Sequence, residues 1–287
     1  INSLFRDTNA WYHIALTSKN SGNYFELYIN GVKETSFSYD NRANYPAGNN
    51  TEVNSNDIHY LGAWNNGGLQ YFDGYLADVN FIDGTCVGDT SGILDELGEL
   101  KNGVWIPKKY TGSYGTNGYR LEFKQTGVGT ASTTTIGADT SGNTHHYTSS
   151  GIVASDCAMP DSPENNFATM NTIDNYNTGV TYSEGNLKWT ISSADGAGRA
   201  TFVMTSGKWY TEFLTNADYI GVVSGDADIV TVNGTQTVFY AADGTKRVNS
   251  SSSSYGASYS DGDIIGIALN MDDEEVTFYK NNHHKAL

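Results

Sequence analysis

Acidic side chains are the first candidates for chemistry, because hydrolysis of a sugar polymer needs two carboxyl groups facing one glycosidic bond, about 5–9 Å apart. Two acidic groups stand out in the sequence: Asp95, Glu96 and Glu99, and the run Asp272–Glu275. The first group falls on an expected helix and the second in an expected turn. Neither places two carboxylates at alternating positions on one face of a strand. We therefore expect no catalytic residues and no enzyme activity.

Aromatic side chains in loops are the second candidates, because an aromatic face suits a sugar ring and nearby amides suit its hydroxyl groups. Trp64 lies in Ala63–Gly68, a segment of turn-forming residues without a strand pattern. Tyr255 and Tyr259 stand beside the serine-rich run Asn249–Ser254 and are expected to line a loop surface. These three side chains are our candidate ligand contacts. The alternative for Trp64 is a ring that folds back to cap the core.

Histidine and cysteine residues give little support for metal or thiol chemistry. His145–His146 and His283–His284 are adjacent pairs, and adjacent residues on a strand point to opposite faces, so neither is a ready two-ligand site. Cys86 and Cys157 are too few for a disulfide scaffold, and they either pair or remain free thiols. The sequence has no phosphate-binding glycine loop and no nucleophile elbow. We expect no cofactor from these patterns.

The composition of the 287-residue chain is typical of an all-β protein, with 32 Gly, 20 Tyr and 11 Phe but only 4 Pro. The length predicts about two domains. The formal net charge of −16 argues against nucleic acid or an anionic membrane as a partner, because both require patches of Lys and Arg. No apolar run approaches the roughly 20 residues of a membrane-spanning helix. Since Ile1 is not an initiator, we expect the chain to be a segment of something longer.

Two segments near the N-terminus alternate with the period of a strand, Trp11–Thr17 and Tyr24–Asn30. In the first, Tyr12, Ile14 and Leu16 share one face. In the second, the side chains expected to point inward are Phe25, Leu27 and Ile29. The dipeptide Asn30–Gly31 predicts a hairpin with a type I′ turn, because both positions need a positive φ.

One helix is expected, over Ser91–Leu100. Ser91 is a candidate N-cap. An apolar stripe follows at helical spacing, formed by Ile93, Leu94, Leu97 and Leu100. The helix would be two to three turns long and would pack on a sheet edge.

The segment Tyr255–Lys280 predicts two strands joined by the acidic turn Asp272–Glu274. Its alternation places large apolar side chains on one face of each strand. These are Ile265, Ile267, Leu269 and Met271 in the first strand, and Val276 and Phe278 in the second.

Four blocks of the second half resemble the SPRY family and stand in that family's order. They are Ser206–Phe213, Tyr219–Val222, Gly262–Leu269 and Val276–Asn281. The resemblance extends from about Asn166 to the end of the chain. It implies a bent antiparallel β-sandwich that binds through its loops and is not an enzyme. It also implies a returning strand beyond Leu287.

Four blocks of the first half resemble the second half of a laminin-G-like, concanavalin-A-like domain. They are Ala10–Leu16, Leu27–Gly31, Tyr60–Gly62 and Phe72–Val79. The resemblance implies a jelly-roll of two packed antiparallel sheets, with its first strands preceding Ile1. It also implies a packing role for His13, which stands where the family has a structural histidine beside a tryptophan.

Residues 139–143 resemble the D-x-S-G-N element of laminin-G-like domains. The element belongs to the first sandwich or begins a second, truncated copy. Because such domains often bind calcium through loop Asp and Asn residues, the resemblance makes Asp139 and Asn143 candidate calcium ligands. The alternative is a hydrogen-bonded Asx turn.

The expected fold class is therefore all-β, with two antiparallel β-sandwich domains, jelly-roll or concanavalin-A-like and SPRY-like, and one short helix. We place the first domain at 1–157, including an irregular connecting segment, and the second at 158–287. The boundary follows from Pro160 and Pro163 in the stretch 158–166.

The order of these units, the linking block Asn102–Tyr119 and the Tyr, Gly, Ser, Thr and Asn content resemble structural proteins of marine bacteriophages, such as tail fibres. That resemblance implies a non-enzymatic protein of the virion that attaches to a host surface glycan or protein. It also implies contacts with other virion proteins and a homo-oligomer, trimeric in a fibre. The alternatives are a secreted or cell-surface lectin-like adhesin and a purely structural or decoration protein of the virion.

Overall fold

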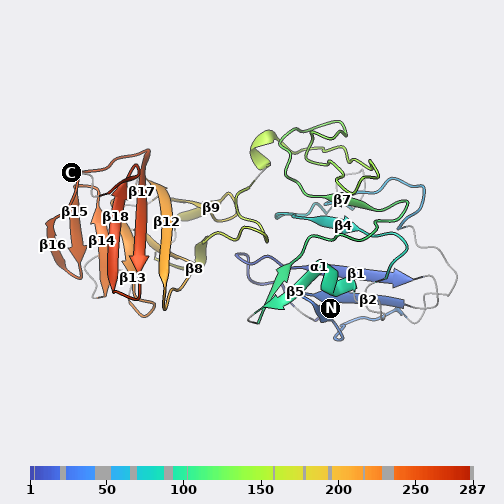
Figure 1. Ribbon diagram of the computed structural model, residues 1–287, viewed down its shortest axis with the longest axis horizontal. Coiled ribbons are helices and arrows are strands. Elements are labelled where there is room, and N and C mark those ends of the chain that lie inside the picture. Colours follow the sequence, from blue (N-terminus) through green and yellow to red (C-terminus); the bar gives the residue numbers. More distant parts are fainter. Residues whose placement is uncertain are drawn as a thin grey trace. The chain divides into compact units, whose positions relative to one another are not determined.

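The computed structural model describes residues 1–2, 4–19, 24–42, 53–64, 70–86, 93–101, 103–157, 159–176, 179–192, 196–215, 217–227 and 236–284. The chain divides into two compact units, Ile1–Phe167 and Ala168–Leu287, and strands predominate in both (Figure 1). The expected boundary after Cys157 falls inside the first unit. Asp161 explains this position, because its carboxylate accepts a hydrogen bond from Trp11 Nε1 at 2.9 Å and so ties its segment to the first unit.

The first unit is built from short antiparallel pairings. One sheet has the order β1-β2-β3, from β1 (Ile14–Lys19), β2 (Tyr24–Ile29) and β3 (Val32–Lys33). The remaining pairs are β4 (Val79–Phe81) with β7 (Tyr119–Leu121), and β5 (Gly98–Lys101) with β6 (Val104–Pro107). The hairpin predicted at Asn30–Gly31 is confirmed, because it joins β2 to β3 and its residues have φ values of 48° and 75°.

The buried face of the β1-β2 pair is opposite to the one predicted for β2, because Tyr28 is buried while Phe25, Leu27 and Ile29 are only half-buried. Ile14 and Leu16 are 56% and 69% exposed, whereas Ala15 and Tyr28 are buried. The core on this side is completed by residues far along the chain, namely Leu97, Tyr110 and Tyr114. An alternating pattern defines two faces, but those distant residues decide which face is covered.

The expected helix is shorter than predicted. Helix α1 covers Ile93–Leu97, and the chain then enters β5, which pairs with β6. Leu97 is buried and Leu94 packs against the same core, but Leu100 is 68% exposed on β5. Ser91, the expected cap, lies outside the described residues. A 3₁₀ turn, η2 (Ala154–Asp156), occurs later in this unit. Among the described residues, no helix is long and apolar enough to cross a bilayer.

The second unit contains two four-stranded antiparallel sheets (Figure 1). One has the order β12-β17-β18-β19, from β12 (Lys208–Thr215), β17 (Asp263–Asn270), β18 (Glu275–Lys280) and β19 (His283–His284). The other has the order β13-β14-β15-β16, from β13 (Tyr219–Val223), β14 (Thr237–Ala241), β15 (Thr245–Val248) and β16 (Ser251–Ser254).

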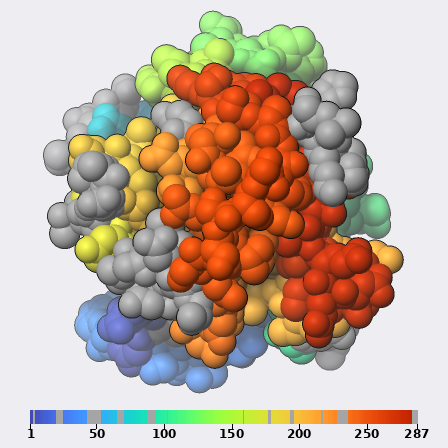
Figure 2. All heavy atoms as spheres, turned by 90° about the vertical axis from the view of Figure 1, so that its left-hand side faces the viewer, coloured from blue at the N-terminus to red at the C-terminus, as the bar shows by residue number. Residues whose placement is uncertain are grey.

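Two further strand pairs belong to this unit. They are β8 (Met170–Tyr176) with β11 (Ala197–Ala200), and β9 (Val180–Ser183) with β10 (Lys188–Ile191). Figure 2 looks onto the side of the unit that carries β15 and β16, whose atoms are coloured orange-red. All four serines of β16 are exposed at this sheet edge.

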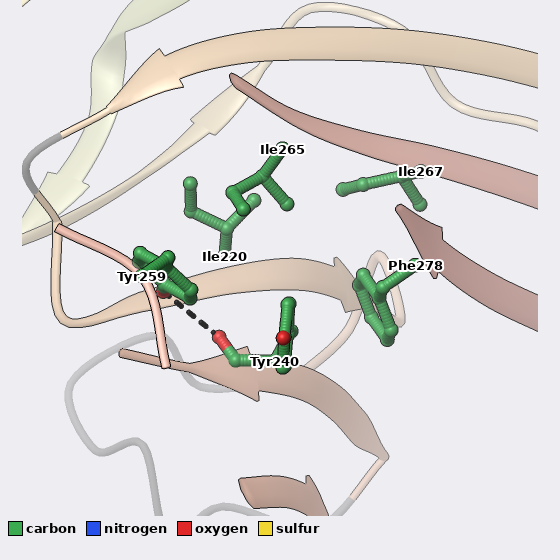
Figure 3. Packing of buried hydrophobic residues seen from close by; sticks show 6 residues of the cluster. All are labelled: Ile220, Tyr240, Tyr259, Ile265, Ile267 and Phe278. Carbon is green, nitrogen blue, oxygen red and sulfur yellow. Dashed lines mark hydrogen bonds between the residues drawn. The ribbon is translucent and has the colours of Figure 1, made fainter. Parts of the chain in front are cut away.

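The core of the second unit lies between its two four-stranded sheets (Figure 3). The predicted inward face of β17 is confirmed, because Ile265 and Ile267 are 0% and 3% exposed, and Phe278 of β18 is 2% exposed. Full burial of such a side chain contributes about 1.5–3 kcal/mol. These residues therefore hold β12, β17 and β18 as a fixed platform.

Candidate ligand-binding surfaces

Trp64 has the exposure that a ligand contact requires. Trp64 is 73% exposed, so its ring does not cap the core of the first unit. The segment 65–69 that follows it lies outside the described residues. Trp64 therefore stays a predicted ligand contact, with its ring face open to solvent.

Tyr259 is placed differently from our expectation, in the core and not on a loop surface. It is 6% exposed, and its hydroxyl donates to the carbonyl oxygen of Tyr240 at 3.0 Å (Figure 3). The same proton is shared with the carbonyl oxygen of Asp218 at 3.2 Å. Tyr255 is half-buried, and its ring packs edge-on against Phe278 with centroids 6.0 Å apart. The serine-rich run forms strand β16, so the segment after it closes the sandwich and directs both rings inward.

Asp139 and Asn143 form a hydrogen-bonded clasp. Asp139 Oδ1 accepts from the backbone N–H groups of Arg120 and Ser141 at 2.9 and 2.8 Å, the second of which is an Asx turn. Its Oδ2 accepts from Ser141 Oγ at 3.0 Å and from His145 N at 2.9 Å. Asn143 Nδ2 donates to the carbonyl oxygens of residues 115 and 118, both at 2.8 Å. This geometry is that of the hydrogen-bonded Asx turn, the alternative to a calcium site, and it closes a loop.

The electrostatics of Asp139 agree with that role. Burial opposes ionisation of its carboxyl group, but the hydrogen bonds from Arg120, Ser141 and His145 outweigh burial and hold its pKa below the ordinary value. Among the described residues, no group of three or more His, Cys, Asp or Glu side chains is arranged to hold a metal ion. A calcium ion bound by Asp139 and Asn143, as the resemblance implies, would require both carboxylate oxygens of Asp139 to release existing partners.

His13 packs against an aromatic ring. Its imidazole lies 5.7 Å from the ring of Trp105, with 31° between the planes. Trp105 in turn fills the space over two glycines, because a Cβ at Gly31 or Gly98 would overlap its ring. Burial lowers the pKa of His13 and outweighs the attraction of Asp78, which acts in the opposite direction.

Sequence reasoning missed an ion network in the first unit that brings two carboxylates together. Arg120, 3% exposed in its side chain, contacts Asp78 Oδ1 at 2.7 Å and Glu122 Oε1 at 3.2 Å. Burial disfavours the charged form of Glu122, but Lys124, Thr140 and Arg120 lower its pKa below the ordinary value. The available signal was the i, i+2 spacing of Arg120 on β7 and Glu122 directly after that strand. Cys86 and Cys157 are not joined to each other by a disulfide.

A groove of about 300 Å³ lies beside the exposed face of the β1-β2-β3 sheet. Its lining is apolar apart from two charged side chains. The lining residues are Leu4, Phe5, Tyr12, Ile29, Val32, Lys33 and Glu34.

The exposed face of the sheet containing β12, β17 and β18 carries an aromatic surface that sequence reasoning also missed. Tyr210 is 56% exposed, and its hydroxyl donates to Glu212 Oε1 at 2.8 Å. Tyr279 of β18 lies with its ring centroid 6.1 Å from that of Tyr210, at 74°. In the register, Gly266 of β17 lies opposite Glu212 on one side and Tyr279 on the other. The sequence signal for this surface was that Tyr210 and Glu212 share one face of β12, with Gly266 on the neighbouring strand.

Comparison with known families finds one matching domain in each half of the chain. Residues 2–89 match the family model of the concanavalin A-like lectin/glucanases superfamily, in its laminin G form. Residues 211–287 match the SPRY domain. A concanavalin-A-like domain is thus followed by a SPRY domain, which confirms the all-β, β-sandwich fold class. Domains of these two kinds indicate carbohydrate or protein binding, and the first superfamily includes both lectins and glucanases. No curated protein matches the chain.

Proposed function

We propose that this chain is a non-enzymatic binding protein of a bacteriophage virion appendage, similar to a tail fibre, that attaches the particle to a host surface glycan or protein. The observation that carries the binding function is the succession of a concanavalin-A-like and a SPRY domain in one chain. Exposed rings on both units, Trp64 in the first and Tyr210 in the second, supply contact surfaces for it.

The state of the neighbouring carboxylates supports a role without catalysis. A glycosidase needs one carboxyl group that stays protonated near neutral pH as a general acid. Asp78 and Glu122 instead share Arg120 between them, and the pKa of Glu122 is lowered. This pair is therefore suited to stabilising a buried guanidinium and not to protonating a leaving group.

The setting on a virion rests on the resemblance of the domain order and the linking block to phage structural proteins. In that setting the chain forms a homo-oligomer, which is a trimer in a fibre. Antibody-gold labelling of purified particles, with peptide mass spectrometry of the same particles, tests the assignment. Label on tail tips or fibres supports it. Label on the capsid favours a decoration protein, and label on cell surfaces with none on particles favours an adhesin.

The binding function is tested separately on the purified full chain. A glycan array and a pull-down with host surface extract should give saturable binding to a glycan or a surface protein. The same preparation, incubated with a panel of polysaccharides, should release no reducing ends. Turnover of any polysaccharide would contradict the non-enzymatic role, and failure of both binding assays would contradict the binding role.

A further inference from the structure

We propose that the exposed face of the sheet containing β12, β17 and β18 is a glycan-binding platform for a pyranose of a non-acidic glycan, with Tyr210 as the stacking ring and Glu212 as the acceptor for the sugar hydroxyls. This inference rests on the proposed binding function and names its ligand class and site in the second unit. Tyr279 forms the neighbouring wall of the platform.

Tyr210 is held in place from below. Its phenol end lies against Gly266, where an added Cβ would meet Tyr210 Oη at 2.5 Å and Cζ at 3.1 Å. Gly266 is buried under this contact, yet Tyr210 remains 56% exposed. The ring therefore lies low on the sheet and offers the rest of its surface to solvent. A sugar ring can place its C–H groups against such an aromatic surface.

The hydrogen bond from Tyr210 Oη to Glu212 Oε1 at 2.8 Å fixes the ring and the carboxylate relative to each other. Tyr279 adds a second ring at 6.1 Å, which limits rotation of Tyr210 on that side. A ring whose rotamer is fixed before binding loses little side-chain entropy when a ligand arrives. The platform is thus preorganised by contacts within the sheet.

The polar groups of the platform select the ligand by charge. An ionised Glu212 is only an acceptor, so it suits hydroxyl or ammonium donors and repels carboxylate or sulfate groups. The turn that joins β17 to β18 adds Asp272, Asp273 and Glu274, and the chain as a whole carries a net charge of −16. Glu212 and the acidic turn outnumber Lys208, which alternation along β12 places on the same face as Tyr210, so an acidic polysaccharide is disfavoured and a neutral or amino sugar is favoured.

The apolar part of the surface continues along the same face. Leu214 of β12 is 76% exposed, and Ile264, directly opposite on β17, is 38% exposed. Glu212 lies between this pair and Tyr210 on the strand. Aromatic and aliphatic surface therefore flanks the carboxylate on both sides, as a ligand with several rings in a row would require.

The test uses the full chain on a glycan array of neutral, amino and acidic sugars, followed by calorimetric titration of the strongest ligand. Tyr210→Ala should weaken that binding at least tenfold, while Tyr210→Phe, which keeps the ring, should weaken it two- to fivefold. Tyr176→Ala is the matched control, because Tyr176 is a half-exposed tyrosine of the same unit on strand β8. It should bind like the wild type. Equal melting temperatures for the variants would show that each is folded.

Three outcomes separate this inference from the function on which it rests. If Tyr210→Ala binds as tightly as the wild type while Trp64→Ala loses binding, the glycan site lies in the first unit, and the inference is overturned although the binding function stands. Binding of a host surface protein with no glycan binding also overturns the inference alone. If the wild type binds neither a glycan nor a surface protein, both proposals fail.

Discussion

Replacing Asp139 with Ala should destabilise the first unit strongly, because the clasp satisfies several backbone donors at once. Asp139 is 8% exposed and accepts four hydrogen bonds, including one from the backbone N–H of Arg120, a residue that is 2% exposed. A buried donor left without a partner costs about 1–3 kcal/mol. The N–H groups of Ser141 and His145 lie nearer to solvent, where water replaces the lost acceptor. We therefore expect a loss of about 3 kcal/mol.

Urea unfolding followed by tryptophan fluorescence measures this loss, and a loss of that size lowers the melting temperature by roughly 6–12 °C for a unit of this length. Asp40→Ala is the control, since Asp40 is an exposed carboxylate of the same unit that pairs with Arg42. It should leave the midpoint close to that of the wild type. A loss below about 1 kcal/mol for Asp139→Ala would refute the assignment of the clasp, because one buried unmade hydrogen bond already costs that much.

The pH dependence of the stability difference between the wild type and Asp139→Ala provides a second test of the clasp. The pKa of Asp139 is lower in the folded chain than the value of about 3.9 expected when unfolded. The ionised clasp therefore contributes stability above that value and loses it as the pH falls through the folded pKa. The difference between the wild type and Asp139→Ala should accordingly shrink below about pH 4. A difference that stays constant from pH 7 to pH 3 would contradict an ionised clasp.

Three further predictions follow from other contacts. Tyr259→Phe removes the donor to the Tyr240 and Asp218 carbonyls and should cost about 1–2 kcal/mol of stability in urea unfolding, without changing glycan affinity. Calcium should not raise the melting temperature over EDTA, because the Asp139 oxygens already accept four hydrogen bonds. Glu122→Gln should lower the free energy of unfolding by about 1 kcal/mol through its weakened contact with Arg120, and should leave polysaccharide hydrolysis undetectable.

Each of these has a control and a contradicting result. A change in the glycan affinity of Tyr259→Phe, measured at a temperature where the variant is fully folded, would make Tyr259 a ligand contact again. Magnesium serves as the control for calcium, and a rise with calcium alone would restore the metal site. Asp95→Asn is the control for Glu122→Gln, and sugar release that disappears only in Glu122→Gln would make Glu122 a catalytic residue.

The core of the second unit could be predicted from sequence because its strands carry large side chains on one face and small ones on the other. Ile265 and Ile267 alternate with Gly266 and Ala268, so the sequence itself indicates which face packs. In β1 both faces carry apolar residues, and the buried one holds the smaller Ala15. Contacts with residues far along the chain decide which face of β1 is buried, and local alternation carries no information about those contacts.

The candidate site was harder to predict than the core because the same residue type serves both. Tyr259 follows a serine-rich run and Tyr210 stands in a strand, so local composition favoured the first as the exposed tyrosine. The structure reverses this order, with Tyr259 6% and Tyr210 56% exposed. The deciding fact is topological: β12 lies at the edge of its sheet, and among the described residues no other strand pairs with its second side.

Gly266 gives a physical reason why the face of a sheet can serve as the binding surface of this unit. A glycine in a central strand loses the packing of a side chain and usually weakens the sheet. Here its missing side chain leaves room for the ring of Tyr210, which covers the backbone that the glycine exposes. The core below is closed by Ile265 and Ile267, so the strand tolerates the glycine. The ring is thus fixed by the sheet itself, as a preorganised binding surface requires.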